Sequence, residues 1–221
     1  MLERLGKSEV DVVCFPEQWL AENKIDDFEA TFAPIAKIAK QYSMCVIPGA
    51  FYTKSGTKNT ISAPVIDHTG TIIGSQEKIH PFDYEKDSIK AGTEAKVFSA
   101  KCKFGIVICY DMVFADVAET MVKKGAEVLF SPSRIVRRGI FPWHLYVQTR
   151  ALENRVPILA ANVQNAKFGG KSIIVDLTEN DGVMIPKTRI SIGQTTRFET
   201  FDLKKYESAR KTRYSDHKKF S

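Results

Sequence analysis

The apolar residues of this chain gather in short runs the length of a β-strand, and polar turns separate one run from the next. Residues 10–15, interrupted only by Asp11, and residues 104–109 are two examples. Apolar runs of this length are typical of strands buried on both faces. No run approaches the roughly 20 apolar residues that a membrane-spanning helix needs. We therefore expect a layered fold built on buried strands, with no membrane-spanning segment.

The spacing of apolar residues also predicts helices and hairpins. Between residues 26 and 42 apolar side chains recur at steps of three and four, which predicts a helix with one buried face. Residues 60–67 and 71–77 are separated by a His-Thr-Gly turn and predict a hairpin, followed by a polar loop at 78–92. Further strands are predicted at 44–51, 97–100, 104–109, 126–130, 156–163, 172–177 and 195–203, further helices at 115–124 and 142–154, and a loop at 131–141.

This mixture of strand–helix–strand alternation and hairpins favours an α+β sandwich over a purely doubly wound sheet. A sheet that carries helices on one face must bury its other face against something. A chain of 221 residues can build such a core without disulfide or metal support. No shift in composition marks a linker, so we predict a single domain over residues 1–221, with 204–221 as a basic tail.

Charge and cysteine usage limit the classes of partner and compartment. The net charge is +6, and part of the excess lies in the tail. A basic tail can bind nucleic acid, but no zinc-finger spacing or RNA-binding motif accompanies it, so we expect no nucleic-acid partner. The four cysteines, Cys14, Cys45, Cys102 and Cys109, include no Cys-x-x-Cys pair, which argues against a metal site. Without a signal-peptide segment, the chain is expected to be reduced and cytoplasmic.

Cys109 is the first candidate for chemistry. It ends the apolar run 104–109 and precedes Tyr110, Asp111 and a predicted helix. A residue at such a corner can be exposed at the end of a sheet, where ligands usually bind. A thiol near a helix start also gains from the helix dipole, which favours the thiolate. The alternative is an inert cysteine buried in the core.

Three charged side chains follow strands or lie in the polar loop. Glu17 comes directly after the run 10–15 and Pro16, and a carboxylate at the end of a buried strand costs energy unless it is paired or used as a base. Lys78 ends the predicted hairpin, where its ammonium could stabilise a developing oxyanion. Glu85 lies in the polar loop. Taken singly, each is equally consistent with a solvated surface residue.

The order of these segments resembles that of the nitrilase superfamily of carbon–nitrogen hydrolases, in its amidase-like branch. The matching segments are Phe-Pro-Glu at 15–17, Glu-Lys-Ile-His at 77–80, Tyr-Glu-Lys at 84–86, Ile-Cys-Tyr-Asp at 108–111, Arg-Ala-Leu-Glu-Asn at 150–154 and the Gly-Gly turn at 169–170. The resemblance covers residues 10–203 and implies a four-layer α-β-β-α sandwich. Relatives usually begin with a further strand and helix before the Phe-Pro-Glu segment, so we expect this chain to lack them and to expose a strand edge.

The resemblance also implies the roles of the candidate residues. Glu17 would be the general base, Lys78 the oxyanion donor, Cys109 the nucleophile and Glu85 a supporting acid. The backbone N–H of Tyr110 would complete the oxyanion hole. This chemistry requires no metal or organic cofactor, and relatives suggest a homodimer or larger homo-oligomer.

Substrate preference is less well defined by the sequence. The loop predicted at 131–141 should border the pocket, and Arg134 and Arg137 could bind a carboxylate of the substrate. Tyr52 and Trp143 are candidate pocket walls. The alternatives are that the arginines lie on the surface or at a subunit contact and that the aromatic residues belong to the core. The expected substrate is a small amide, with a preference for one that bears a carboxylate, and a nitrile or an N-carbamoyl compound is the alternative.

Two further functional interpretations stay open. One is a non-catalytic scaffold on the same fold. The other is a papain-like protease, which would need a histidine near Cys109; the four histidines are His68, His80, His144 and His217. The absence of a cysteine early in a helix with a late His-Asn pair disfavours the protease.

Overall fold

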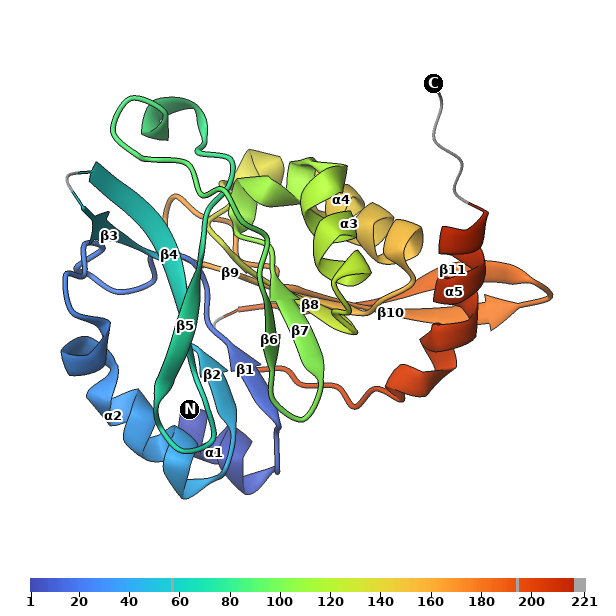
Figure 1. The fold of residues 1–221 in the computed structure, drawn as a ribbon, viewed down its shortest axis with the longest axis horizontal. Helices are drawn as coiled ribbons and strands as arrows, with labels where there is room; N and C mark the ends of the chain where they lie inside the picture. The colour runs from blue at the N-terminus through green and yellow to red at the C-terminus, as the bar shows by residue number, and fades with distance from the viewer. Residues whose placement is uncertain (57, 194, 217–221) are drawn as a thin grey trace.

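The computed structural model describes residues 1–56, 58–193 and 195–216 and contains two β-sheets packed face to face, with helices on both outer sides (Figure 1). The layers are separated by three clusters of buried apolar side chains. One lies between the two sheets, and each of the other two lies between one sheet and its helices. The four-layer α-β-β-α sandwich that the family resemblance implies is therefore confirmed.

The first sheet carries the N-terminal half of the chain. Its strands follow the order β1-β2-β4-β3, and β5 also pairs with β4. β1 and β2 are parallel, and all other pairs in this sheet are antiparallel. The strands are β1 (Val12–Cys14), β2 (Cys45–Ile47), β3 (Phe51–Ser55), β4 (Lys58–Ile66) and β5 (Ile72–Glu77).

The second sheet follows the order β11-β10-β9-β8-β7-β6. Its centre, β7-β8-β9, is parallel and buried, and antiparallel strands complete both sides. The strands are β6 (Val97–Ser99), β7 (Lys103–Ile106), β8 (Val128–Ser133), β9 (Ile158–Asn162), β10 (Ile173–Asn180) and β11 (Val183–Ile190).

Helices cover the outer face of each sheet (Figure 1). In α2 the N-terminus is capped by Asp27, whose carboxylate accepts a hydrogen bond of 3.0 Å from the Ala30 N–H, and Phe32 and Ala39 face the first sheet. Within the described ranges no helix is both long and apolar enough to cross a membrane. The helices are α1 (Leu2–Lys7), α2 (Phe28–Gln41), α3 (Ala115–Lys123), α4 (Ile140–Asn154) and α5 (Glu207–Ser215), with short 3-10 helices η1 (Asp83–Glu85), η2 (Cys109–Val113), η3 (Arg137–Gly139) and η4 (Leu203–Tyr206).

Several element boundaries differ from the sequence prediction. β8 continues through Ser133, so the expected loop at 131–141 begins three residues late. β7 ends at Ile106 rather than at Cys109, because the backbone leaves the sheet before the left-handed Cys109. β11 was not predicted, because most of its side chains are solvent-exposed and give no apolar run. α1, η4 and α5 were not predicted either; the helical residues 203–215 cover most of the basic segment, and its last residues, 217–221, lie outside the described residues.

The strand predicted at 195–203 does not form. The sequence alternates as a strand does, but a strand also needs a hydrogen-bonded neighbour. Among the described residues, 195–201 make no backbone–backbone hydrogen bond. Thr195 to Glu199 instead line a groove of about 530 Å³, which is also lined by Val12 and Cys14 of β1. Among the described residues β1 pairs with β2, and its residues also line this groove.

Candidate active site

Glu17 is held at the junction of the two sheets. The last sheet bond of this segment runs from the Phe15 N–H to the Ile47 carbonyl, at 2.9 Å. The Glu17 N–H then donates to the carbonyl of Ser133 at the end of β8, at 3.3 Å, which connects it to the second sheet. Its side chain is only 2% exposed. The backbone therefore turns a carboxylate into the interior where the two sheets meet.

Lys78 enters the same interior from the end of β5. Its N–H donates to the Ile61 carbonyl at 2.7 Å, and its carbonyl accepts from the Gly92 N–H at 2.8 Å. The Lys78 side chain is 1% exposed, and its ammonium lies 3.0 Å from Glu17 Oε1 and 2.9 Å from Glu85 Oε2. One buried cation thus contacts two carboxylates contributed by separate segments.

Glu85 is the second of these carboxylates and is itself held in place. It lies in η1 and is 4% exposed. Its Oε2 accepts a hydrogen bond of 2.7 Å from the Phe82 N–H, so the side chain closes the turn that carries it. Removing charges from water costs several kcal/mol per ion unless partners replace the lost solvation. The ion cluster Glu17–Lys78–Glu85 is therefore an arrangement that stability alone does not favour.

Cys109 lies against this ion cluster. It is the first residue of η2, is 9% exposed and has a left-handed backbone with φ of 48°. A non-glycine residue in this region is strained, and such strain is concentrated at functional sites. Burial raises the pKa of the Cys109 thiol, and the carboxylate of Glu17, which accepts a hydrogen bond from it, raises it further. The charge of Lys78 and the Arg134 N–H oppose this shift without reversing it.

The direction of this shift corrects one sequence expectation. A helix dipole was expected to favour the thiolate, but η2 is a single short 3-10 helix, and burial outweighs its field. The thiol is therefore protonated at neutral pH, and a base must remove its proton before it can attack. Lys78 behaves differently. Burial alone would lower its pKa, but Glu17, Cys109 and Glu85 together raise it well above the ordinary lysine value, so it remains an ammonium.

A second group of side chains lies beside the ion cluster. Arg134 follows β8, and its guanidinium donates to the side-chain oxygen of Gln18 and lies 4.4 Å above the Phe168 ring. Its Nε is buried and has no hydrogen-bond partner among the described residues. Tyr52 bonds to the Gln18 side chain, and burial and the charges of Glu85 and Glu17 raise its pKa. Gln18 and Phe168 were not predicted; Gln18 could have been found by its position next to Glu17.

The other predicted binding residues lie elsewhere. Arg137 begins η3, is exposed and donates to the Asn165 carbonyl at 3.2 Å. Trp143 is 4% exposed and belongs to the apolar cluster between the second sheet and its helices, whereas Cys109 belongs to the cluster between the sheets. Its ring therefore packs in the helix layer, and we leave it out of the proposed pocket. Tyr110 follows Cys109, and its ring makes edge contacts with Phe82 and Phe114.

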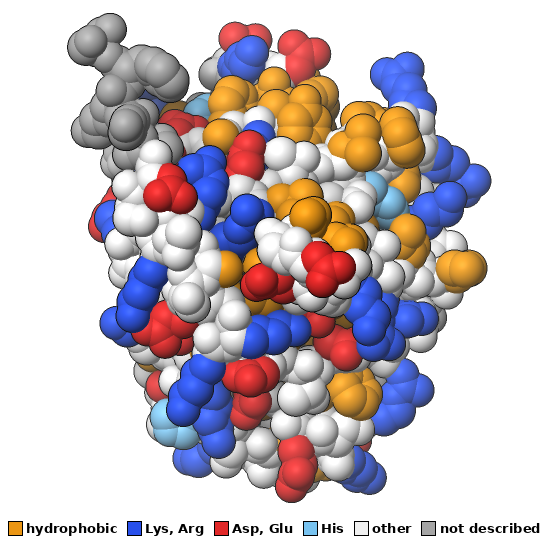
Figure 2. All heavy atoms as spheres, turned by 90° about the vertical axis from the view of Figure 1, so that its right-hand side faces the viewer, with side chains coloured by type: hydrophobic (Ala, Val, Ile, Leu, Met, Phe, Trp, Pro, Cys, Tyr) orange, Lys and Arg blue, Asp and Glu red, His pale blue; other side chains and the backbone are white. Residues whose placement is uncertain are grey.

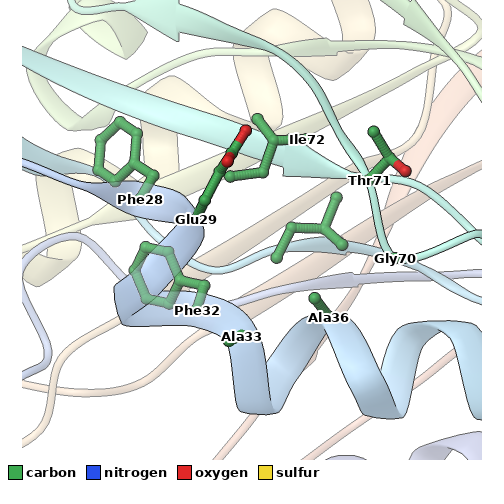
Figure 3. Close-up of a pocket in the computed structure, with 9 residues that line it drawn as sticks. Phe28, Glu29, Phe32, Ala33, Ala36, Gly70, Thr71 and Ile72 are labelled. Atoms are coloured by element: carbon green, nitrogen blue, oxygen red, sulfur yellow. The ribbon is translucent and has the colours of Figure 1, made fainter.

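Two other features of the surface are distinct from this site. A cavity of about 360 Å³ lies between α2 and the β4–β5 turn, where Figure 3 shows Phe28, Phe32 and Ile72 among its lining residues. None of the four candidate catalytic side chains lines it. Across the described parts of the chain, no three His, Cys, Asp or Glu side chains are grouped so that they could hold a metal ion.

The fold and this site together define the class of protein: an α-β-β-α sandwich with a cysteine beside a buried Glu–Lys–Glu cluster. The family model described as carbon–nitrogen hydrolase matches residues 1–196. The chain belongs to this family, and the resemblance to the nitrilase superfamily is confirmed.

Individual relatives support the same assignment. The chain is 36% identical over 148 residues to an N-carbamoylputrescine amidase of Arabidopsis thaliana, which covers 60% of this chain and 48% of the relative. It is 30% identical over 203 residues to a citrullinase of Francisella tularensis, covering 80% and 69% respectively. A carbon–nitrogen hydrolase structure from Helicobacter pylori G27 has the same fold, with a TM-score of 0.75, 20% identity and coverage of 98% and 89%. The chain spans about half the length of several curated relatives that it matches.

Proposed function

We propose that this chain hydrolyses a non-peptide C–N bond of a small amide through a thioester on Cys109. The observation that carries the proposal is the buried ion cluster of Glu17, Lys78 and Glu85 around a protonated thiol. The cluster supplies a proton acceptor, a fixed positive charge and a nucleophile within one site. A scaffold without activity would have no need to bury these three charges.

In the first step Glu17 takes the proton of the Cys109 thiol, and the sulfur attacks the amide carbon. The carbonyl π bond opens and negative charge develops on its oxygen. The ammonium of Lys78 and the backbone N–H of Tyr110 stabilise this oxyanion, an effect of about 3 kcal/mol per donor. Because the raised pKa of Lys78 keeps it protonated, it acts as a fixed charge and not as an acid.

In the second step the carbonyl re-forms and the C–N bond breaks. Glu17 returns its proton to the leaving nitrogen, which departs as ammonia or an amine, and the acyl group remains on Cys109 as a thioester. Glu17 then takes a proton from a water molecule, whose oxygen attacks the thioester carbon. The C–S bond breaks, the acid leaves, and Glu17 returns the proton to the sulfur of Cys109. Glu85 does not react: its contact of 2.9 Å with the ammonium orients Lys78 toward the oxyanion.

Arg134 supports a carboxylate-bearing substrate. Its guanidinium has a buried Nε without a partner among the described residues and is stacked on Phe168. Such a planar donor can bind a carboxylate through two hydrogen bonds. Tyr52 would form a polar wall of the same pocket, whereas the exposed Arg137 contributes at most at the rim. Nitrile and N-carbamoyl substrates are the alternatives, and the name of the Arabidopsis relative keeps the second one relevant.

The test compares succinamate with butyramide, two amides of similar length of which only the first has a distal carboxylate. Ammonia release is measured for the wild type and for Cys109→Ala. We expect turnover that Cys109→Ala abolishes, with kcat/KM at least about tenfold higher for succinamate. Equal rates for the two amides would remove the carboxylate preference. Turnover that survives Cys109→Ala would remove the thioester mechanism.

The surface of α4 carries exposed apolar side chains that suit a contact between subunits. Phe141, Leu145 and Tyr146 of α4 are exposed by 74%, 48% and 37% and lie on neighbouring turns of the helix. Figure 2 shows hydrophobic side chains gathered in the upper part of the face it presents, with charged residues of both signs around them. We propose a homo-oligomer formed through the α4 surface, in the cytoplasm, and sedimentation of Leu145→Glu against wild type would test the oligomer.

A further inference from the structure

Asp111 is a buried carboxylate that the mechanism above does not use. It is 1% exposed and lies in η2, two residues after Cys109. Its Oδ2 accepts from the Ile79 N–H at 3.1 Å, and its Oδ1 accepts from the His80 N–H at 2.6 Å. These two donors directly follow Lys78 in the chain. The carboxylate therefore connects the segment that carries the ammonium with the segment that carries the nucleophile.

The side chain of His80 adds a third contact. Its Nδ1 lies 3.1 Å from Asp111 Oδ1, and its ring is stacked on Phe114, with centroids 3.7 Å apart and planes 11° from parallel. Phe114 directly follows η2, so the ring stack joins the same two segments a second time. The hydrogen bond to Asp111 raises the pKa of His80 against the opposing effect of burial, and Asp116 contributes in the same direction.

The alternative explanation is a purely structural carboxylate, and the location of the bonds argues against it. The backbone of Lys78 already makes hydrogen bonds with Ile61 and Gly92, so the end of β5 does not need Asp111 to stay in place. Asp111 instead connects the segment of Lys78 with the strained backbone at Cys109. The hydrogen bond from the His80 N–H to Asp111 joins residues that are 31 positions apart in the sequence. A displacement of about 1 Å between reacting groups can reduce a rate about 100-fold.

We propose that Asp111 is a positioning residue that fixes the Lys78 ammonium relative to the Cys109 sulfur, with His80 as its protonatable partner. The proposal rests on the proposed function, because it assigns Asp111 to the geometry of that reaction. Asp111 does not touch the reacting atoms; it acts through the backbone on both sides of the site. Its loss should therefore reduce kcat and leave substrate binding almost unchanged.

The experiment measures kcat and KM for succinamate hydrolysis by the full chain. In Asp111→Asn one acceptor oxygen becomes an NH₂ group that faces an N–H donor, so we expect kcat to fall 10- to 100-fold with KM within about threefold. In His80→Gln both backbone bonds to Asp111 remain, so we expect a loss of threefold or less. Asp181→Asn, at an exposed acid in the turn between β10 and β11, is the matched control and should retain wild-type kcat.

A second variant keeps the test decisive if Asp111→Asn fails to fold. Asp111→Glu keeps the charge but changes the reach, so we expect a kcat loss of at least tenfold with KM retained and thermal unfolding close to wild type. Wild-type kcat in Asp111→Glu, or a rise in KM that accounts for the whole loss in either variant, would overturn the proposal. Failure of the proposed function gives a different result, because Cys109→Ala would then be as active as the wild type.

Discussion

Lys78 and Arg150 are two buried cations that differ in the groups they bind. Lys78 is surrounded by the carboxylates of Glu17 and Glu85. Arg150, 6% exposed in α4, donates from Nε to the Met112 carbonyl at 3.2 Å and from its Nη2 to the Val113 carbonyl at 2.8 Å. Lys78 has two buried carboxylates as partners, whereas Arg150 binds two backbone oxygens at the end of η2 and the partly exposed carboxylate of Glu153.

This difference indicates what each charge is for. Backbone carbonyls cannot take up or release a proton, so the bonds from Arg150 to Met112 and Val113 fix the end of the segment that begins with Cys109. The carboxylate of Glu17 beside Lys78 can exchange protons with the thiol and the substrate, and the ammonium can stabilise a new negative charge. We therefore interpret Arg150, whose carboxylate partner is partly exposed, as structural, and Lys78, which has two buried carboxylates beside a thiol, as chemical.

The largest effect is expected for Lys78→Met. Removing the ammonium removes the oxyanion donor and leaves two buried carboxylates without a cation, so kcat/KM for succinamate should fall by about 10³-fold or more. Lys54→Met, which removes an exposed lysine of β3, is the control and should retain activity. If Lys78→Met keeps more than a tenth of wild-type activity while Lys54→Met is normal, the chemical role of the Lys78 cluster is wrong.

In contrast to Lys78→Met, Arg150→Met should affect stability more than activity. Two buried carbonyls lose their donor, so the free energy of unfolding in urea should fall by about 2–4 kcal/mol. The chemistry itself is untouched, and kcat at a temperature where the variant is folded should change less than tenfold. Arg138→Met, at an exposed position of η3, serves as the control. A variant as stable as wild type would show that Arg150 does not hold η2.

The buried thiols give a smaller effect that depends on pH. Burial raises the pKa of Cys45 to about 12 and that of Cys102 to about 11, and it also raises that of Cys109. The thiol of an unfolded cysteine has a pKa of about 8.5, so the unfolded state loses its protons first, and stability falls as the pH rises from there toward the raised pKa values. Urea unfolding at pH 7 and pH 10 should show this loss, and Cys45→Ala should make it shallower. If wild type and Cys45→Ala lose the same free energy of unfolding between pH 7 and pH 10, the buried Cys45 thiol does not contribute to this loss.

The smallest effect is expected where a charge is paired at the surface. Lys123 contacts Glu119 at 2.6 Å on α3, and both side chains are partly exposed. Pairs of this kind contribute about 0.5 kcal/mol or less, so Lys123→Ala should leave thermal unfolding and kcat almost unchanged. A large loss of stability in Lys123→Ala would mean that burial does not explain why Lys78 and Arg150 contribute more than Lys123.

The sequence predicted the layers and most strands because buried strands and amphipathic helices carry strong periodic signals. It did not predict β11 or α5, because their exposed polar side chains give no apolar period. It wrongly predicted a strand at 195–203, because alternation reports the preference of a segment and not the presence of a neighbour. Whether residues 1–221 act as a single domain remains a prediction.

Only part of the candidate site could be predicted from local sequence patterns. Glu17 and Cys109 could be selected from their positions at strand ends, but Lys78 and Glu85 were indistinguishable from surface residues until the resemblance was considered. Their burial depends on contacts across distant segments, such as Lys78 with Glu17, which no local pattern contains. Asp111 was visible beside Cys109, but its partners Ile79 and His80 were not.

The most direct test of the account is intact-mass spectrometry of the wild-type chain mixed with succinamate and quenched within one turnover. We predict a transient mass increase equal to the acyl group, located on Cys109 by peptide mapping and absent from Cys109→Ala. Substrate turnover with no adduct at Cys109, or an adduct at another residue, would contradict the thioester mechanism.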